Sequence, residues 1–176
     1  MAQLNFPSSL PNFQEIADEI SQSSFFQSIE TSNRNEGVFL RLAELVVEKE
    51  FGEGEILIQE RELCQAVWLF VEGRVSATKR SPTVFEGAAK VAVFEKNTSF
   101  GDTSLLEPNL SALTLTAESY GRLFILDEMA FTQFSKEYPE AALQVQTSVA
   151  RSLMHQIKKA QEALRLLQTT IEILSA

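Results

Sequence analysis

The last quarter of the sequence carries the pattern that most restricts the fold. From Ala150 to Leu174, apolar residues recur at alternating spacings of three and four positions. This heptad pattern is typical of a helix that buries one narrow apolar seam against another helix. The seam consists of Ala150, Leu153, Ile157, Ala160, Leu164, Leu167, Ile171 and Leu174.

Two structures are compatible with this seam. One is a coiled-coil homodimer, and the other is a single amphipathic helix packed on the chain's own domain. A helix over residues 139–176, with Pro139 in its first turn, would be about 55 Å long, which exceeds the width of a compact domain. We therefore expect a homodimer through this helix, and packing on the chain's own domain is the alternative.

The middle of the chain has a different pattern. Short apolar runs alternate with turn residues, and six of the seven glycines fall here, as is typical of an all-β sandwich or barrel. The predicted strands are 47–51, 55–59, 67–71, 74–80, 89–95, 112–118 and 122–127. Helices are predicted over 12–29 with Asn12 as N-cap, over 38–47, and over 128–136 after Asp127.

These elements predict three units. They are an N-terminal lead-in and helix (1–37), a β-rich domain with short flanking helices (38–138), and a long dimerisation helix (139–176). We expect a mainly β fold with helices at both ends.

The scarcity of histidine and cysteine excludes several classes of site. The chain has one His and one Cys, too few for a structural zinc site or for a metal site of the cupin type. Cys64 lies in an apolar stretch and is best interpreted as a core thiol in a reducing compartment. His155 is expected at a surface or interface. With no nucleophile–base arrangement, we expect no catalytic residues, no metal and no cofactor.

Charge and hydropathy limit the partners. The net charge is −9, and residues 1–60 account for −8 of it, which disfavours direct binding to nucleic-acid phosphates. The apolar runs are too short to span a bilayer, and the N-terminus lacks the features of a signal peptide. We expect a cytoplasmic chain that does not engage a membrane and that acts through dimerisation or a protein partner.

A short motif in the β-rich region could bind an anion. In the stretch Phe100-Gly101-Asp102-Thr103-Ser104, a glycine precedes a helical turn, and such turns can direct backbone N–H groups at an anion. An ordinary Gly-Asp turn with aspartate as N-cap explains the same residues.

The order and spacing of three strings give the chain a family resemblance. They are F-G-E-G-E-I-L-I-Q-E, V-W-L-F-V-E-G-R-V and S-F-G-D-T-S-L-L-E. Over roughly residues 35–160 the chain resembles the cyclic-nucleotide-binding domain family, and its last helix looks like the long helix of the bacterial cyclic-AMP receptor proteins. The resemblance implies an eight-stranded jelly roll, or double-stranded β-helix, with a ligand inside it.

The resemblance also implies a set of ligand-binding residues. They are Gly101, Asp102, Thr103, Ser104, Ser111, Ala112, Thr114 and Gln156. Asp102 takes the place of the glutamate that binds the ribose 2′-hydroxyl in the family. Gln156 aligns near the positions that contact the purine, and a solvent-facing glutamine is the alternative. The family also usually has glycine where this chain has Arg61.

The largest departure from the family concerns the phosphate. Ser111 stands where the family has the arginine that pairs with the cyclic phosphate, and no Arg or Lys occurs from residue 97 to 121. Loss of a charge-assisted bond of about 1.5–3 kcal/mol would weaken binding by about one to two orders of magnitude.

Two hypotheses for function follow. The first is a non-enzymatic sensor that binds a cyclic nucleotide or related anion weakly, if at all, and signals through its C-terminal coiled coil. The second is a degenerate domain that binds no cyclic nucleotide and acts as a structural dimerisation or protein-docking module. A third interpretation, a cupin-like enzyme on a similar roll, conflicts with the single histidine.

Overall fold

The structure is a computed structural model that describes residues 12–29, 36–80 and 87–174. The lead-in over residues 1–11 and part of the loop before residue 36 lie outside the described residues. The α-helices are α1 Phe13–Gln22, α2 Glu36–Leu45, α3 Glu128–Glu137 and α4 Pro139–Leu174, and the 3-10 turns are η1 Ser24–Phe26 and η2 Asp102–Leu105. The strands are β1 Val47–Phe51, β2 Ile56–Ile58, β3 Leu63–Cys64, β4 Ala66–Glu72, β5 Val75–Arg80, β6 Ala88–Phe94, β7 Ser99–Phe100, β8 Asn109–Leu110, β9 Thr114–Ala117 and β10 Gly121–Asp127.

The strands form a jelly roll. One sheet has the order β1-β10-β4-β7 and the other has the order β2-β9-β5-β6, with a short β3-β8 ribbon beside them. The strand pairs in these sheets are antiparallel. This confirms the predicted roll with helices at both ends, although helices contain more of the described residues than strands do.

The sheet that contains β4 and β10 is covered on both faces. Along β4, Val67 and Leu69 pack in a core with the helices, while Phe70 packs in a second core inside the roll. In β10, Phe124 belongs to the helical core and Leu123 to the roll core. Because successive side chains of a strand point to opposite faces, a sheet between two cores needs continuous apolar runs.

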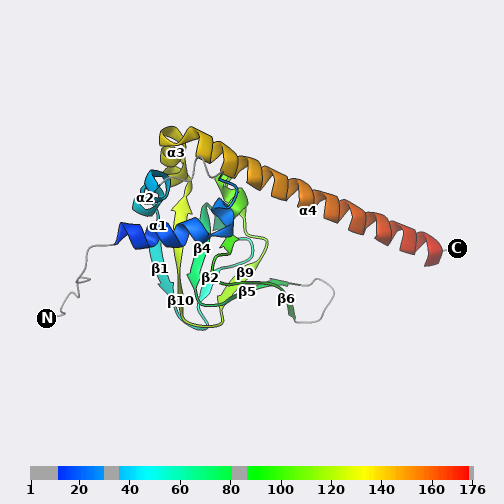
Figure 1. The fold of residues 1–176 in the computed structure, drawn as a ribbon. Coiled ribbons are helices and arrows are strands. Elements are labelled where there is room, and N and C mark those ends of the chain that lie inside the picture. The colour runs from blue at the N-terminus through cyan, green and yellow to red at the C-terminus, as the bar shows by residue number, and fades with distance from the viewer. Residues whose placement is uncertain (1–11, 30–35, 81–86, 175–176) are drawn as a thin grey trace.

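A helical layer lies against this sheet (Figure 1). Its centre contains Ile20, Phe26, Leu42, Phe134 and Val145, whose side chains are almost completely buried. They come from α1, η1, α2, α3 and the start of α4. The N-terminal helices and the start of the C-terminal helix therefore share one core.

The predicted single helix over 12–29 is wrong in its second half. The helix ends at Gln22, and Ser23 takes an extended conformation in which its hydroxyl accepts a hydrogen bond from the Phe25 N–H. Serine competes for backbone hydrogen bonds in this way, so it favours a new turn over a continued helix. Asn12 stands at the N-cap position of α1 as predicted, but its side chain makes no capping hydrogen bond.

The C-terminal helices begin where the sequence predicts. Asp127 caps α3 by accepting a hydrogen bond from the Ala130 N–H at 2.8 Å. The backbone of Tyr138 then leaves the helical region, and Pro139 starts α4. Proline suits that first position because it has no N–H to leave unpaired.

Helix α4 has a buried base and an exposed remainder. Ala141, Ala142, Val145 and Val149 are buried against the domain, and Leu153 is half-buried. Beyond Leu153 the helix projects away from the roll, on the same side as the β5–β6 hairpin (Figure 1). Within the described ranges, no helix has both the length and the apolar composition needed to cross a membrane.

Candidate ligand pocket

A pocket of about 400 Å³ opens between the roll, the turn η2 and helix α4. Pockets of this size can hold a small organic molecule. The residues around it are Cys64, Phe94, Ser99, Phe100, Gly101, Asp102, Thr103, Asn109, Leu110, Ser111, Ala112, Leu113 and Gln156.

Gly101 shapes the turn that carries Asp102 into the pocket wall. Its φ is +82°, a left-handed conformation that favours glycine. A Cβ at this position would lie 2.4 Å from the Ala66 carbonyl oxygen and 3.1 Å from Cys64 Sγ. Both the turn and the close approach to β4 therefore require glycine. Asp102 follows at the start of η2, where its Oδ1 accepts a hydrogen bond from the Thr103 N–H at 3.1 Å.

Ser111 holds the opposite wall, and its polar groups are already occupied. Its hydroxyl donates to the Leu113 carbonyl oxygen at 2.7 Å. Its backbone N–H donates to the Glu62 carbonyl at 2.8 Å, and its own carbonyl accepts from the Arg61 N–H at 2.7 Å. The side chain is 4% exposed. Ser111 therefore closes its own turn, and its hydroxyl does not replace a cation facing the ligand.

Arg61 occupies a left-handed position in the loop that holds Ser111. Its φ is +72°, which is costly for a side chain other than glycine, asparagine or aspartate. The resemblance gave glycine at this position, and the backbone keeps the conformation that glycine favours. The exposed Arg61 side chain is not among the residues that line the pocket.

Six of the eight residues expected from the sequence line the same pocket. They are Gly101, Asp102, Thr103, Ser111, Ala112 and Gln156. Ser104 and Thr114 do not line it. Ser104 is 1% exposed, and Thr114 is turned toward the β2 loop, where its hydroxyl accepts the Glu60 N–H at 2.9 Å. A role in ligand binding stays a prediction for all eight.

The sequence interpretation missed the aromatic and amide part of the lining. The rings of Phe94 and Phe100 meet edge to face with centroids 5.5 Å apart. Asn109 donates to Thr103 Oγ1 at 3.0 Å and to the Glu107 carbonyl at 3.1 Å, so it braces the turn η2. Phe100 stood beside the Gly-Asp motif and could have been selected, but nothing in the sequence places Phe94 or Asn109 at the same site.

One of the described residues that line the pocket is charged, and its charge is negative. Asp102 is the only ionisable carboxylate in its lining, and no Lys, Arg or His of the described chain lines it. Arginines elsewhere on the domain pair with glutamates on the outer surface. Arg41 lies 2.6 Å from Glu137, and Arg74 lies 3.0 Å from Glu118.

These outer pairs change the acidity of their carboxylates. Lys90, followed by Arg74, lowers the pKa of Glu118 by hydrogen bonding to it. Arg41 lowers the pKa of Glu137 in the same way. In the part of the chain that the structure describes, no group of three or more His, Cys, Asp or Glu is placed to hold a metal ion.

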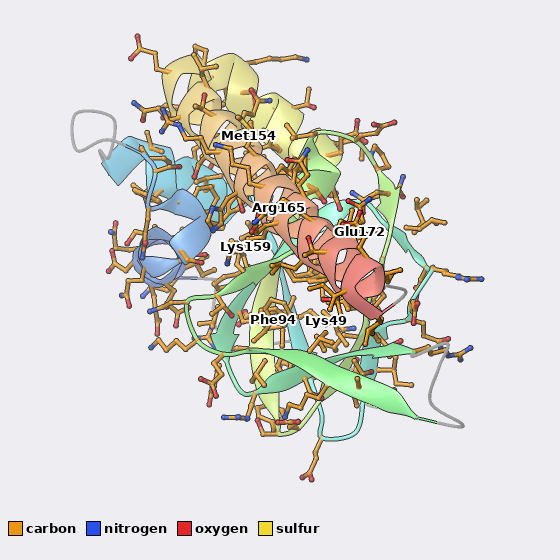
Figure 2. The ribbon with its side chains drawn as sticks, turned by 90° about the vertical axis from the view of Figure 1, so that its right-hand side faces the viewer. Lys49, Phe94, Met154, Lys159, Arg165 and Glu172 are labelled. Carbon is orange, nitrogen blue, oxygen red and sulfur yellow. The ribbon has the colours of Figure 1, made fainter. Side chains whose placement is uncertain are left out.

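Helix α4 joins the pocket to the heptad seam. Gln156 lines the pocket, and it lies between the seam residues Leu153 and Ile157 on the same helix. The seam residues Ile157, Leu164, Leu167 and Ile171 are 56–64% exposed. Figure 2 shows the helix in front of the roll, with Met154, Lys159, Arg165 and Glu172 marking its length.

Comparisons with known proteins give a consistent family. The sequence model of the family described as "Cyclic nucleotide-binding domain" matches residues 48–138, about half of the chain. No curated protein gives a significant sequence match.

Solved structures share the fold at low sequence identity. The N-terminal domain of a transcriptional regulator from Streptomyces coelicolor A3(2) aligns with a TM-score of 0.69 and 20% identity, over 81% of this chain and 94% of that one. The catabolite activator protein of Thermus thermophilus aligns with a TM-score of 0.68 and 20% identity, over 83% of this chain and 63% of that one.

A third structure is a regulatory subunit of a cAMP-independent protein kinase A from Trypanosoma brucei, solved as a mutant bound to cAMP in its A site. It aligns with a TM-score of 0.63 and 16% identity, over 80% of this chain and 46% of that one. This chain therefore spans less than two thirds of the length of the Thermus and Trypanosoma proteins. The match over residues 48–138 and the roll around the pocket lead to one conclusion: the chain belongs to the cyclic nucleotide-binding domain family.

Proposed function

We propose that this chain is a non-enzymatic regulatory module that senses a small ligand in its roll and signals through a dimer formed by α4. The observation that carries the proposal is the position of Gln156. It lines the pocket on the same helical turns that begin the apolar seam. A ligand that contacts Gln156 would act directly on the helix that pairs with a second copy.

The pocket supports the sensing part of this proposal. It has the volume of a small-molecule site, a glycine-dependent turn and an aromatic wall. The lack of a cation facing Asp102 and Ser111 argues that a cyclic nucleotide binds weakly, if at all, because its phosphate would have no charged partner.

The exposed seam supports the dimer. Four apolar side chains at heptad spacing stand more than half exposed on the projecting part of α4. Soluble proteins rarely leave such a continuous apolar stripe in water, and pairing of two helices would bury it. The Streptomyces neighbour is the N-terminal domain of a transcriptional regulator. We propose a regulatory output here as well, passed through the dimer to a protein partner, since the net charge of −9 disfavours direct contact with nucleic acid.

The alternative is a docking module that binds no cyclic nucleotide. The occupied hydroxyl of Ser111 favours it, because this residue closes a turn where the family has a phosphate-binding arginine. The same seam and the same roll serve both functions, so the pocket must be tested directly.

The test restores the missing cation. Ser111→Arg and native protein are titrated with cyclic AMP in a thermal-shift measurement, with Ser111→Ala as the control for loss of the turn-closing hydroxyl. Ligand at a hundred times its dissociation constant stabilises a fold by about 2.7 kcal/mol, a shift of several degrees for a chain of this size. The Trypanosoma mutant that binds cAMP includes a threonine-to-arginine substitution among its three changes.

We expect Ser111→Arg to shift more than native protein at equal cyclic AMP concentration, and Ser111→Ala to behave like native protein. A folded Ser111→Arg variant that does not respond to cyclic AMP would overturn the cyclic-nucleotide form of the proposal and favour the docking module. Light scattering tests the other half of the proposal, with an expected mass of twice 19.7 kDa.

A further inference from the structure

The hydrogen-bonding groups around the pocket are unevenly divided between donors and acceptors. Both N–H bonds of the Asn109 amide are used, toward Thr103 Oγ1 and the Glu107 carbonyl, so its oxygen remains as an acceptor. The Gln156 amide nitrogen donates to Ser152 Oγ at 3.5 Å, and its oxygen also remains. Asp102 accepts only one internal bond and can donate none while ionised.

Few side-chain donors remain to balance these oxygens. The Ser111 hydroxyl gives its proton to Leu113. The hydroxyls of Ser99 and Thr103 and one N–H of the Gln156 amide are the side-chain donors left in the described lining. Three acceptor groups, one of them a charged carboxylate, therefore belong to residues that line a space where none of the described lining residues is basic.

A neighbouring cavity also has a polar lining without a described basic residue. It has a volume of about 250 Å³ and shares Ser99 and Asp102 with the main pocket. Its other polar side chains are Ser24, Ser148 and Ser152, and none of its described lining residues is basic. The Asp102 carboxylate thus has no basic neighbour lining the cavity on either side.

We infer that the pocket selects a small molecule without negative charge. A flat ring of this molecule packs beside Phe94 and Phe100. Its hydroxyl or amino groups donate hydrogen bonds to Asp102, Asn109 and Gln156. The aromatic pair provides a surface for a ring. An anion would be repelled by the Asp102 carboxylate, and no basic residue of the described lining would offset this repulsion. A neutral molecule rich in donors would instead form hydrogen bonds to the three acceptor groups. This inference rests on the proposed function, because it takes the pocket to be a ligand site.

The test uses two probes that share a flat base and a sugar, adenosine and cyclic AMP. The phosphate of cyclic AMP is closed on the 3′ and 5′ oxygens, so this probe carries a negative charge and also has two fewer hydroxyl donors than adenosine. Calorimetric titration of the full chain with each probe at low and high salt measures the discrimination. We expect adenosine to bind at least about tenfold more tightly than cyclic AMP at low salt, with a smaller ratio at high salt because salt screens the repulsion.

Two variants locate the source of the discrimination. Asp102→Asn keeps the side-chain shape and removes the charge, so the ratio of the two affinities should fall by severalfold. Glu107→Gln is the matched control, because it removes one carboxylate from the same loop at an exposed position that does not line the pocket. It should leave the ratio unchanged, and circular dichroism confirms that both variants fold.

The outcomes separate this inference from the proposed function. Equal affinity for the two probes, or tighter binding of cyclic AMP by native protein, would overturn the inference. So would a native chain that binds neither probe while Ser111→Arg binds cyclic AMP, since the pocket is then open but refuses a neutral donor-rich molecule. If neither protein binds either probe, the proposed function fails, and the inference fails with it.

Discussion

Helix α4 has apolar side chains in two very different surroundings. In its base, Val145 and Val149 are at most 4% exposed and belong to the core shared with α1, α2 and α3. In the projecting segment, residues 154–174, Leu164 and Leu167 are about 60% exposed. One continuous helix therefore carries apolar residues in two situations. Those at its base are buried within one chain, whereas those of the projecting segment are exposed in the described chain, and the proposed dimer would cover them.

The sharpest test of this contrast is the same substitution made in each region. Leu42 is a fully buried helical residue of the body. Leu42→Ala should lower the free energy of unfolding by about 2–5 kcal/mol, because it removes buried methyl groups and leaves a cavity. Chemical denaturation measures this loss, and the change should not affect the mass at protein concentrations where the variant is folded.

Leu167→Ala is the matched change in the projecting segment, and we expect the reverse pattern. Alanine is an excellent helix former, so the fold of the body should be unaffected. The dimer should weaken by at least about tenfold in dissociation constant, since each copy loses a seam side chain. Sedimentation over a concentration series measures this change. A stable dimer of unchanged affinity would show that the seam is not the interface.

A smaller effect, confined to the body, is expected at Arg61. Arg61→Gly should raise the free energy of unfolding by about 0.5–1 kcal/mol, because glycine relieves the left-handed strain but adds freedom to the unfolded chain. Asn97→Gly is the control at the other described non-glycine residue with positive φ, +69°. Its free energy of unfolding should rise less than that of Arg61→Gly, since asparagine tolerates this conformation. The dimer mass should be the same in both variants.

The smallest expected effect is a pH dependence that also belongs to the body. Arg41 on α2 holds the pKa of Glu137 on α3 below its usual value of 4.5. The pair therefore stabilises the fold above about pH 4.5 and loses this contribution as the pH falls through the lowered pKa. The melting temperature of Glu137→Gln should fall less steeply with acid than that of native protein. Glu140→Gln, on the neighbouring helix, is the control and should follow native protein.

The sequence predicted the elements that repeat a pattern over several residues. The seven apolar runs appear as β1, β2, β4, β5, β6, β9 and β10, and Pro139 starts the long helix. It missed β3, β7 and β8, because two residues are too few to show a strand period. It also extended α1 through Ser23, where one local hydrogen bond decides the conformation.

The pocket, too, could be predicted from the sequence only in part. Gly101 and Asp102 could be selected by family resemblance because they lie in one of the matching strings, and Ser111 because it stands at the position of the family's arginine. The tertiary structure determines which hydrogen bonds these side chains make. The Ser111 hydroxyl donates to the Leu113 carbonyl, and both N–H groups of the Asn109 amide donate to the segment around the turn η2. The balance of donors and acceptors could therefore not be predicted from residue types alone.

The length of the projecting segment makes α4 a mechanical lever. From Leu153 to Leu174 the helix extends by about 30 Å, and Gln156, which lines the pocket, lies in the first turn of this length. A tilt of the helix by about 10° near Gln156 would displace its end by about 5 Å, roughly one turn of helix. A change at the pocket too small to rearrange the roll would therefore be amplified into a displacement that another helix could detect.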